Sequence, residues 1–159
     1  MENGCILLCA PSNVAVDQLL FRILELTRRE NFDAVKIARW GRDDKIDVKL
    51  KHLKPTGKEA FEQLLSADIL ACTLNVCGNG MMTKVGALKK VDCLIIDEAS
   101  QGSELDTIIP FVNFDVKKVI LVGDHLQMSP TVFSEFSRLN MYEQSLFERI
   151  HHSFQKQGR

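Results

Sequence analysis

The feature that most constrains the fold of this chain is an alternation of short, continuous apolar runs with segments of helical periodicity. Runs without polar alternation are typical of strands buried on both faces, as in parallel sheets made of β-α-β units. Five runs have this character: residues 5–10, 34–39, 68–73, 92–97 and 118–123. The sequence therefore predicts an α/β fold with a mostly parallel sheet.

Composition and charge fit one globular domain. The chain has 159 residues, of which 45% are hydrophobic and 26% charged, which is ordinary for a domain with a sizeable core. The formal net charge of −1 shows no basic excess, so charge neither favours nor opposes a nucleic-acid ligand. No apolar run approaches the roughly 18 residues that span a bilayer, and no signal-like segment opens the chain. We expect an intracellular protein of the nucleus or cytoplasm, with no membrane partner.

The five cysteines are expected to pack in the core. They mostly lie inside or beside apolar runs, where a free cysteine behaves as a small hydrophobic residue; they are Cys5, Cys9, Cys72, Cys77 and Cys93. A structural zinc site is not expected, because the sequence holds no C-x-x-C and its four histidines form no ligand spacing with the cysteines.

The segment after the first strand predicts a helix over residues 14–29, which carry apolar side chains at helical spacing. Ser12 or Asn13 suits its N-cap, because a side-chain oxygen there accepts a hydrogen bond from a backbone N–H of the first turn. The same strand-to-helix turn could instead contact a phosphate group. Both interpretations stay open on these residues alone.

The middle of the chain predicts an insertion over about residues 40–66. Residues 41–55 mix acidic and basic side chains and are expected to be solvated, and a short helix fits residues 58–65. The Gly78-Asn79-Gly80 stretch predicts a loop, and it lacks the lysine and hydroxyl residue of a phosphate loop. The domain is expected to cover residues 1–150, with a flexible tail over residues 151–159.

Acidic residues end the last two predicted strands. Asp97 and Glu98 follow one apolar strand, and Gly123 and Asp124 end the next, with Gln127 just beyond. Open α/β sheets bind ligands at the carboxyl ends of their strands, and carboxylates there suit Mg²⁺. Asp97 is therefore a candidate Mg²⁺ ligand acting through water, and Glu98 a candidate base for water attacking a γ-phosphate. Gln127 is a candidate sensor, since an amide can hydrogen-bond both that water and the phosphate.

These residues also allow plainer interpretations. Asp97 and Glu98 could be exposed acids at the start of a helix near residues 101–109, where negative charge is favourable, and Gln127 could be a polar loop residue. The sequence contains no G-x-x-x-x-G-K-[ST] phosphate loop, which normally completes a nucleotide-hydrolysis site.

Five blocks, in order along nearly the whole chain, resemble superfamily 1B RNA/DNA helicases of the senataxin and nonsense-mediated-decay group. The blocks are residues 7–19 (LLCAPSNVAVDQL), 67–73 (ADILACT), 95–101 (IIDEASQ), 120–127 (ILVGDHLQ) and 144–149 (QSLFER). The resemblance implies a partial first RecA-like motor domain, with the three-layer fold of P-loop NTPases. It further implies an ATP-dependent helicase that translocates on single-stranded RNA or DNA, with ATP and Mg²⁺ as cofactors.

The resemblance also assigns roles to the residues at the strand ends. Asp97 serves Mg²⁺, Glu98 is the catalytic base, and Gln127 couples the γ-phosphate to movement between two motor lobes. Gly123 and Asp124 belong to the same nucleotide-binding motif as Gln127.

A nucleic-acid track is implied by the same resemblance. Pro11, Ser12 and Asn13 match the family's first nucleic-acid motif, and Thr73 matches a second at the end of its strand. Such contacts go to the backbone of the nucleic acid and carry no sequence information.

The chain departs from the family in lacking the phosphate loop, which relatives carry on the strand and helix just before this segment, and in lacking the second motor domain. The implied partners therefore include both missing segments, and we expect the isolated chain to be inactive. The strand at residues 118–123 is expected to leave an apolar edge uncovered, which invites pairing with another chain.

Two other classes stay open. One is a non-catalytic nucleic-acid- or protein-binding module derived from a helicase. The other is a receiver-like, Mg²⁺-dependent phosphotransfer domain, in which acids also gather at strand ends. That class has no use for a sensor such as Gln127 or for the turn at residues 11–13.

Overall fold

The computed structural model describes residues 4–30, 34–124, 126, 129–131, 134–139 and 142–156. At its centre is a five-stranded parallel sheet with the strand order β2-β3-β1-β4-β5. The strands are β1 (Ile6–Ala10), β2 (Ile37–Arg39), β3 (Ile69–Thr73), β4 (Cys93–Ile96) and β5 (Val119–Leu121). Each strand lies within a predicted apolar run, so the predicted α/β fold with a parallel sheet is confirmed.

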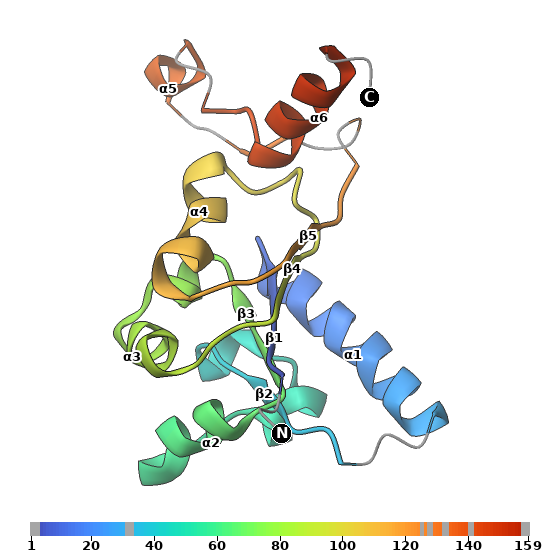
Figure 1. The fold of residues 1–159 in the computed structure, drawn as a ribbon, viewed down its shortest axis with the longest axis vertical. Helices are drawn as coiled ribbons and strands as arrows, with labels where there is room; N and C mark the ends of the chain where they lie inside the picture. Colours follow the sequence, from blue (N-terminus) through green and yellow to red (C-terminus); the bar gives the residue numbers. More distant parts are fainter. Residues whose placement is uncertain are drawn as a thin grey trace.

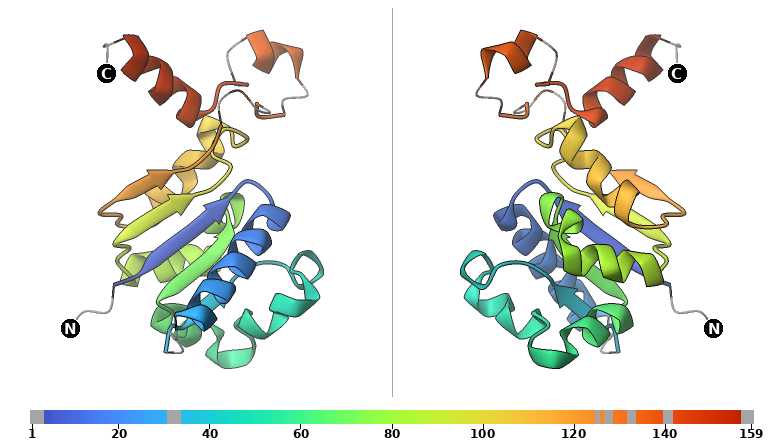
Figure 2. Two further views of the ribbon diagram at one scale, coloured as in Figure 1. Left: turned by 90° about the vertical axis from the view of Figure 1, so that its right-hand side faces the viewer. Right: turned by 90° about the vertical axis from the view of Figure 1, so that its left-hand side faces the viewer.

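Helices lie on both faces of this sheet, so the domain has three layers (Figures 1 and 2). One face carries α1 (Asn13–Arg29), and the other carries α2 (Ala60–Ser66), α3 (Gly80–Leu88) and α4 (Glu104–Asn113). Beyond the carboxyl ends of the strands lie α5 (Glu135–Leu139) and α6 (Leu146–Lys156) (Figure 1). Among the described residues, four 3₁₀ elements lie in the connections: η1 (Asp43–Lys45), η2 (Val48–Leu53), η3 (Gly57–Glu59) and η4 (Asn75–Gly78).

The core consists of two hydrophobic clusters, one on each face of the sheet. Successive side chains of a strand point to opposite faces. Leu7 of β1 accordingly packs in the cluster that includes Met82 of α3, whereas Leu8 packs with Val16 and Leu20 of α1. Both faces of the central strands are covered, which explains why these runs carry no polar alternation.

The charged insertion is more firmly anchored than the sequence indicates. Its acidic and basic side chains are mostly exposed, as expected, but Leu50 of η2 is fully buried and Ile46 nearly so. Both belong to the hydrophobic cluster that contains the inner face of α1. The insertion therefore forms part of the layer beside α1, and α2 confirms the predicted short helix.

A helix that the sequence did not predict, α3, begins at Gly80, within the loop predicted at residues 78–80. That prediction was wrong for Gly78, which ends η4, and for Gly80. Asn79 caps α3 through its side-chain oxygen, which accepts a hydrogen bond from the backbone N–H of Met82 at 2.9 Å. The helix was missed because Gly80 and Gly86 have low helix propensity. Its formation depends on packing, since Met82 and Val85 are fully buried.

The carboxyl-terminal segment is helical beyond the boundary predicted at residue 150. The helix α6 continues to Lys156, so the tail predicted over residues 151–159 is helical over its described part. Ser145 is fully buried and accepts a hydrogen bond from the backbone N–H of Glu148 at 3.1 Å. Arg149 donates to both carboxylate oxygens of Glu104, at 2.6 and 2.8 Å, and so joins α6 to the start of α4.

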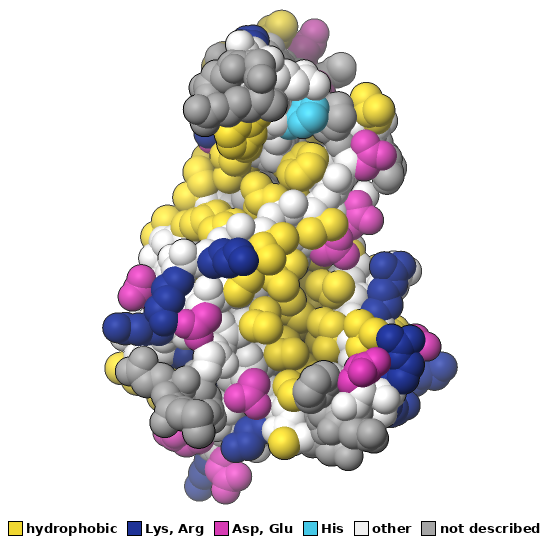
Figure 3. Space-filling model, turned by 45° about the vertical axis from the view of Figure 1, so that its right-hand side comes forward, with side chains coloured by type: hydrophobic (Ala, Val, Ile, Leu, Met, Phe, Trp, Pro, Cys, Tyr) yellow, Lys and Arg dark blue, Asp and Glu magenta, His cyan; other side chains and the backbone are white. Residues whose placement is uncertain are grey.

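One edge of the sheet is open. Within the described part of the chain β5 pairs only with β4, and Val119 and Ile120 are each 38% exposed. Figure 3 shows hydrophobic side chains gathered across the middle of one face of the molecule. Within the described residues, no helix has the length and apolar character needed to cross a membrane.

Candidate nucleotide and nucleic-acid site

Most of the predicted site residues lie together at the carboxyl ends of the strands. Ala10, at the end of β1, pairs in register with Thr73, at the end of β3. On the other side of β1, the backbone N–H of Asp97 donates to the carbonyl oxygen of Cys9 at 2.9 Å. The turn that follows β1, the end of β3 and the acids that follow β4 are therefore neighbours, as the positions at the carboxyl ends of parallel strands require.

Asp97 and Glu98 form a tight turn directly after β4. Both are half-buried, and the backbone N–H of Glu98 donates to Asp97 Oδ1 at 3.1 Å. Glu98 has a φ of 52°, in the left-handed region that residues other than glycine rarely adopt. Gln101 supports this conformation, because its backbone N–H donates to the Glu98 carbonyl oxygen at 2.9 Å and its Nε2 to Glu98 Oε2 at 3.0 Å. Strained backbone that the surroundings hold in place is a recurrent property of functional sites.

The plainer interpretation of these two acids is wrong. The helix that follows, α4, starts at Glu104 and has Ser103 as its N-cap. The acids of its first turn are Glu104 and Asp106. Asp97 and Glu98 lie before the cap, so their position is not explained by a favourable interaction with the N-terminus of this helix.

The end of β5 packs closely on the same turn. The backbone N–H of Ala99 donates to the carbonyl oxygen of Val122 at 2.8 Å. A Cβ atom on Gly123 would lie 3.1 Å from the backbone nitrogen of Ser100 and 3.2 Å from that of Ala99, which is closer than side chains normally come. Glycine at residue 123 therefore allows these two backbones to approach without a shift of either. Asp124 follows, and its Oδ1 accepts a hydrogen bond from the backbone N–H of Leu126 at 2.9 Å.

Two polar groups at this turn fit a ligand rich in oxygen atoms or a hard metal ion. Ser100 is 4% exposed, and its hydroxyl has no hydrogen-bond partner among the described residues. Buried polar groups are nearly always paired, so an orphaned hydroxyl needs an explanation. Over the same part of the chain, Asp97 Oδ2 accepts no hydrogen bond, and a carboxylate oxygen is a ligand that Mg²⁺ prefers. Gln127, the predicted sensor, lies outside the described residues.

The strand-to-helix turn at residues 11–13 has a clear local role. Ser12 is the N-cap of α1, and its Oγ accepts a hydrogen bond from the backbone N–H of Ala15 at 3.1 Å. This confirms the capping interpretation of Ser12. Pro11 is half-buried and Ser12 is exposed, whereas Thr73 is buried, at 6% exposure.

Asn13 is held by a buried arginine that the sequence analysis missed. Nη2 of Arg39, at the end of β2, donates to Asn13 Oδ1 at 2.9 Å, and Nε donates to Asp17 Oδ1 at 2.8 Å. Arg39 is fully buried. Its contact leaves the amide N–H groups of Asn13 without a hydrogen-bond partner in the described part of the chain. The sequence indicated the Asp17–Arg39 pair only through the position of Asp17, an acidic residue next to Val16 on the apolar face of the predicted helix.

The parallel three-layer fold, with acids after β4 and a Gly-Asp pair after the neighbouring β5, defines a RecA-like domain of the P-loop NTPase class. A family model described as an AAA domain matches residues 1–63 and 51–135. The chain belongs to this family, within the superfamily 1B helicase-like group, as the resemblance of its motifs predicted.

Several curated proteins are similar to the chain. It is 32% identical, over an alignment of 186 positions, to "Regulator of nonsense transcripts 1 homolog" of Neurospora crassa, with 94% of this chain and 16% of that protein covered. It is 32% identical to "ATP-dependent helicase upf1" of Schizosaccharomyces pombe, with 94% of this chain and 19% of that protein covered. It is 40% identical to "Helicase sen1" of the same yeast, with 69% of this chain and 6% of that protein covered. The chain thus spans less than a fifth of the length of these relatives.

Proposed function

We propose that this chain supplies the hydrolytic and sensing half of an ATP-dependent helicase motor that translocates on single-stranded RNA or DNA. The observation that carries the proposal is the strained Asp97-Glu98 turn, which packs on Gly123 at the adjacent strand end. Relatives that are named as ATP-dependent helicases support ATP as the nucleotide of this proposal.

In this proposal Asp97 holds Mg²⁺ through bound water, with its free Oδ2 directed to that role. Glu98 accepts the proton of the water that attacks the γ-phosphate. The hydrogen bond from Gln101 to Glu98 Oε2 orients the carboxylate. Gln127 senses the γ-phosphate, and Gly123 and Asp124 bring the chain from β5 to it.

The nucleic-acid track in this proposal runs over the ends of β1 and β3. Pro11, Ser12, Asn13 and Thr73 provide contacts to the backbone of a single strand. Because Arg39 engages Asn13 Oδ1, the amide N–H groups of Asn13 remain available as donors to phosphate or sugar oxygens. RNA and DNA are both compatible with contacts of this type.

A second candidate function is a non-catalytic nucleic-acid- or protein-binding module. Residues 1–159 contain no G-x-x-x-x-G-K-[ST] motif, so these residues alone are expected to bind without hydrolysing ATP. Phosphate-loop backbone groups and their lysine do most of the positioning in phosphoryl transfer by such enzymes. For either function, we expect no measurable ATP hydrolysis by the 159-residue chain alone, with or without single-stranded nucleic acid.

A chimaera separates the two functions. The matching segment of the Schizosaccharomyces pombe upf1 relative is replaced by this chain, so that a phosphate loop and the remaining parts of the relative are present. The motor proposal expects nucleic-acid-stimulated ATP hydrolysis that Glu98→Gln lowers by at least about 100-fold, within the range for general base catalysis. A folded chimaera that binds an ATP analogue but does not hydrolyse ATP would instead support the binding module.

The track is tested by the fluorescence anisotropy of a labelled single-stranded oligonucleotide bound to the same chimaera. Asn13→Ala should weaken binding several-fold, since a direct backbone contact is lost. Gln63→Ala is the matched control, because Gln63 is an exposed amide on α2. Equal effects of the two substitutions would contradict the proposed track.

A further inference from the structure

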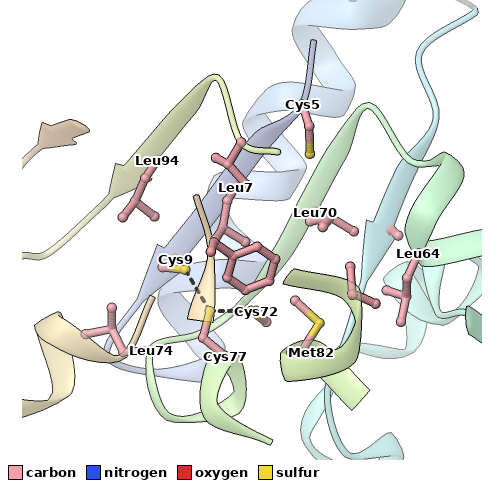
Figure 4. Packing of buried hydrophobic residues seen from close by; sticks show 14 of the residues in the cluster. Cys5, Leu7, Cys9, Leu64, Leu70, Cys72, Leu74, Cys77, Met82 and Leu94 are labelled. Carbon is pink, nitrogen blue, oxygen red and sulfur yellow. Dashed lines mark hydrogen bonds between the residues drawn. The ribbon is translucent and has the colours of Figure 1, made fainter. Parts of the chain in front are cut away.

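Three cysteine sulfurs meet in the core beneath the carboxyl ends of the strands (Figure 4). Cys9 lies on β1, Cys72 on the neighbouring β3 and Cys77 on η4. The Sγ atoms of Cys9 and Cys77 are 3.4 Å apart, those of Cys72 and Cys77 are 3.2 Å apart, and all three lie within 4.8 Å of one another. Each of the three residues is fully buried. Register creates the cluster, because Cys9 and Cys72 are direct partners in the β1–β3 ladder.

Cys77 Sγ lies within hydrogen-bonding distance of both other sulfurs of the cluster. The pKa of the Cys72 thiol is held below its ordinary value, first because Cys77 and then Cys9 can donate an S–H hydrogen bond to its sulfur. The positive charge of Arg39 lowers the same pKa further. Burial, by contrast, raises the pKa of the Cys9 thiol.

We propose that Cys9, Cys72 and Cys77 form a three-thiolate site for a soft metal ion of low coordination number, namely Cu(I). Thiolates select soft ions such as Cu(I) over hard ones. A metal–sulfur bond of about 2.3 Å places three sulfurs of a trigonal site roughly 4 Å apart, so Cys77 Sγ needs to move away from each of the other two sulfurs by roughly 0.6–0.8 Å. This site is independent of the proposed helicase function.

The choice of Cu(I) over Zn²⁺ follows from the number of ligands. Structural zinc is tetrahedral and takes four protein ligands. The described residues supply only these three side chains to the cluster, which matches the ligand number of a trigonal site. Spacing along the sequence gave no sign of such a site, because residues 9, 72 and 77 come together through the sheet.

A route for the ion is available through η4. This element is a single 3₁₀ turn that carries Cys77 inward while Asn75 and Gly78 are exposed. Because η4 lies outside the sheet, a local opening of this turn would expose Cys77 without breaking a strand. On binding, the thiols release their protons to solvent and the ion remains Cu(I), so no oxidant or reductant is required.

The site lies directly below the candidate nucleotide and nucleic-acid site. The carbonyl oxygen of Cys9 accepts the hydrogen bond from the backbone N–H of Asp97, and Cys72 immediately precedes Thr73. A bound ion would therefore brace the two strand ends that carry these residues.

The test is an anaerobic titration of the purified 159-residue chain with Cu(I), in competition with the chromophoric chelator bicinchoninate. We expect one Cu(I) per chain, and X-ray absorption of the loaded wild-type protein should show three sulfur ligands. Serine substitutions at residues 9, 72 and 77 should each lower the affinity at least about tenfold, because mutation of even an outer-shell partner of a metal ligand has an effect of that size. Cys5→Ser and Cys93→Ser are matched controls outside the cluster and should leave the affinity unchanged.

Circular dichroism of each variant shows whether it folds. If a variant does not fold, X-ray absorption of the loaded wild-type protein still tests the proposal. Failure of the wild-type chain to withdraw Cu(I) from bicinchoninate would overturn the proposal. So would a copper centre with fewer than three sulfur ligands, or equal loss of affinity in the Cys5 and Cys93 variants. Displacement of bound Cu(I) by an equal concentration of Zn²⁺ would refute the assignment of the ion.

Discussion

The buried ion pair between Asp17 and Arg39 gives the sharpest stability prediction for this fold. Asp17 Oδ1 accepts from Arg39 Nε, and Asp17 Oδ2 accepts from the backbone N–H of Asp47, both at 2.8 Å. Arg39 also donates to the carbonyl oxygen of Trp40 at 2.8 Å and to Asn13 Oδ1. One pair of side chains thus joins α1, β2 and the charged insertion.

The perturbation is Asp17→Asn, which keeps the shape of the side chain and removes its charge. Arg39 would then hold a buried positive charge with only neutral acceptors around it. Removing one partner of a buried pair costs about 3–5 kcal/mol. Since the substituted amide still offers one oxygen, we expect a loss of about 3 kcal/mol, a large share of the roughly 5–15 kcal/mol that stabilises a typical domain.

The measurement is urea denaturation followed by circular dichroism. The matched control is Asp44→Asn, because Asp44 accepts from Arg42 at 2.8 Å but both side chains are more than half exposed. An exposed pair contributes at most about 1 kcal/mol. If Asp17→Asn and Asp44→Asn lowered the free energy of unfolding equally, the assignment of Arg39 and Asp17 as a structural centre would be refuted.

Three further predictions follow from local geometry. Gly86→Ala should lower the free energy of unfolding by about 1–3 kcal/mol, because the new Cβ would lie 1.9 Å from the carbonyl oxygen of Asn113. Gly80→Ala in the same helix has open space around it and should raise the free energy of unfolding by about 0.5–1 kcal/mol. Urea denaturation measures both, and the opposite ranking would contradict this prediction. Burial raises the pKa of Cys5 from 9.0 to about 11. The contribution of this protonated thiol to the free energy of unfolding should therefore be lost as pH rises from 9 towards 11. If a Cys5→Ala variant showed the same decline, the decline would not come from Cys5. Ile120→Lys should reduce self-association at the open edge in sedimentation velocity, and an unchanged profile would count against edge pairing.

Elements with strong local periodicity were predictable, and those that depend on packing were not. The strands and α1 follow from continuous apolar runs and a helical stripe. Ser12 and Asn13 were both cap candidates from their residue types, and the structure selected Ser12. The helix α3 was missed, since Gly80 and Gly86 argue locally against it and only the burial of Met82 and Val85 compensates.

The candidate site divides in the same way. Asp97, Glu98 and Gly123 were found because their motifs are local and follow strand ends. Three features of the site could not be predicted, because each depends on contacts between separate segments. They are the left-handed backbone of Glu98, the unpaired hydroxyl of Ser100 and the hydrogen bond from Arg39 to Asn13.

The sequence by itself determined the class of this protein: apolar runs and strand-end motifs are short-range patterns, and they suffice for the parallel α/β fold and the helicase family. Only the tertiary structure decided which buried groups meet. Asp17 and Arg39 are 22 residues apart, and Cys9 and Cys77 are 68 apart. Their contacts follow from the strand order β2-β3-β1-β4-β5, a long-range arrangement that local periodicity does not encode.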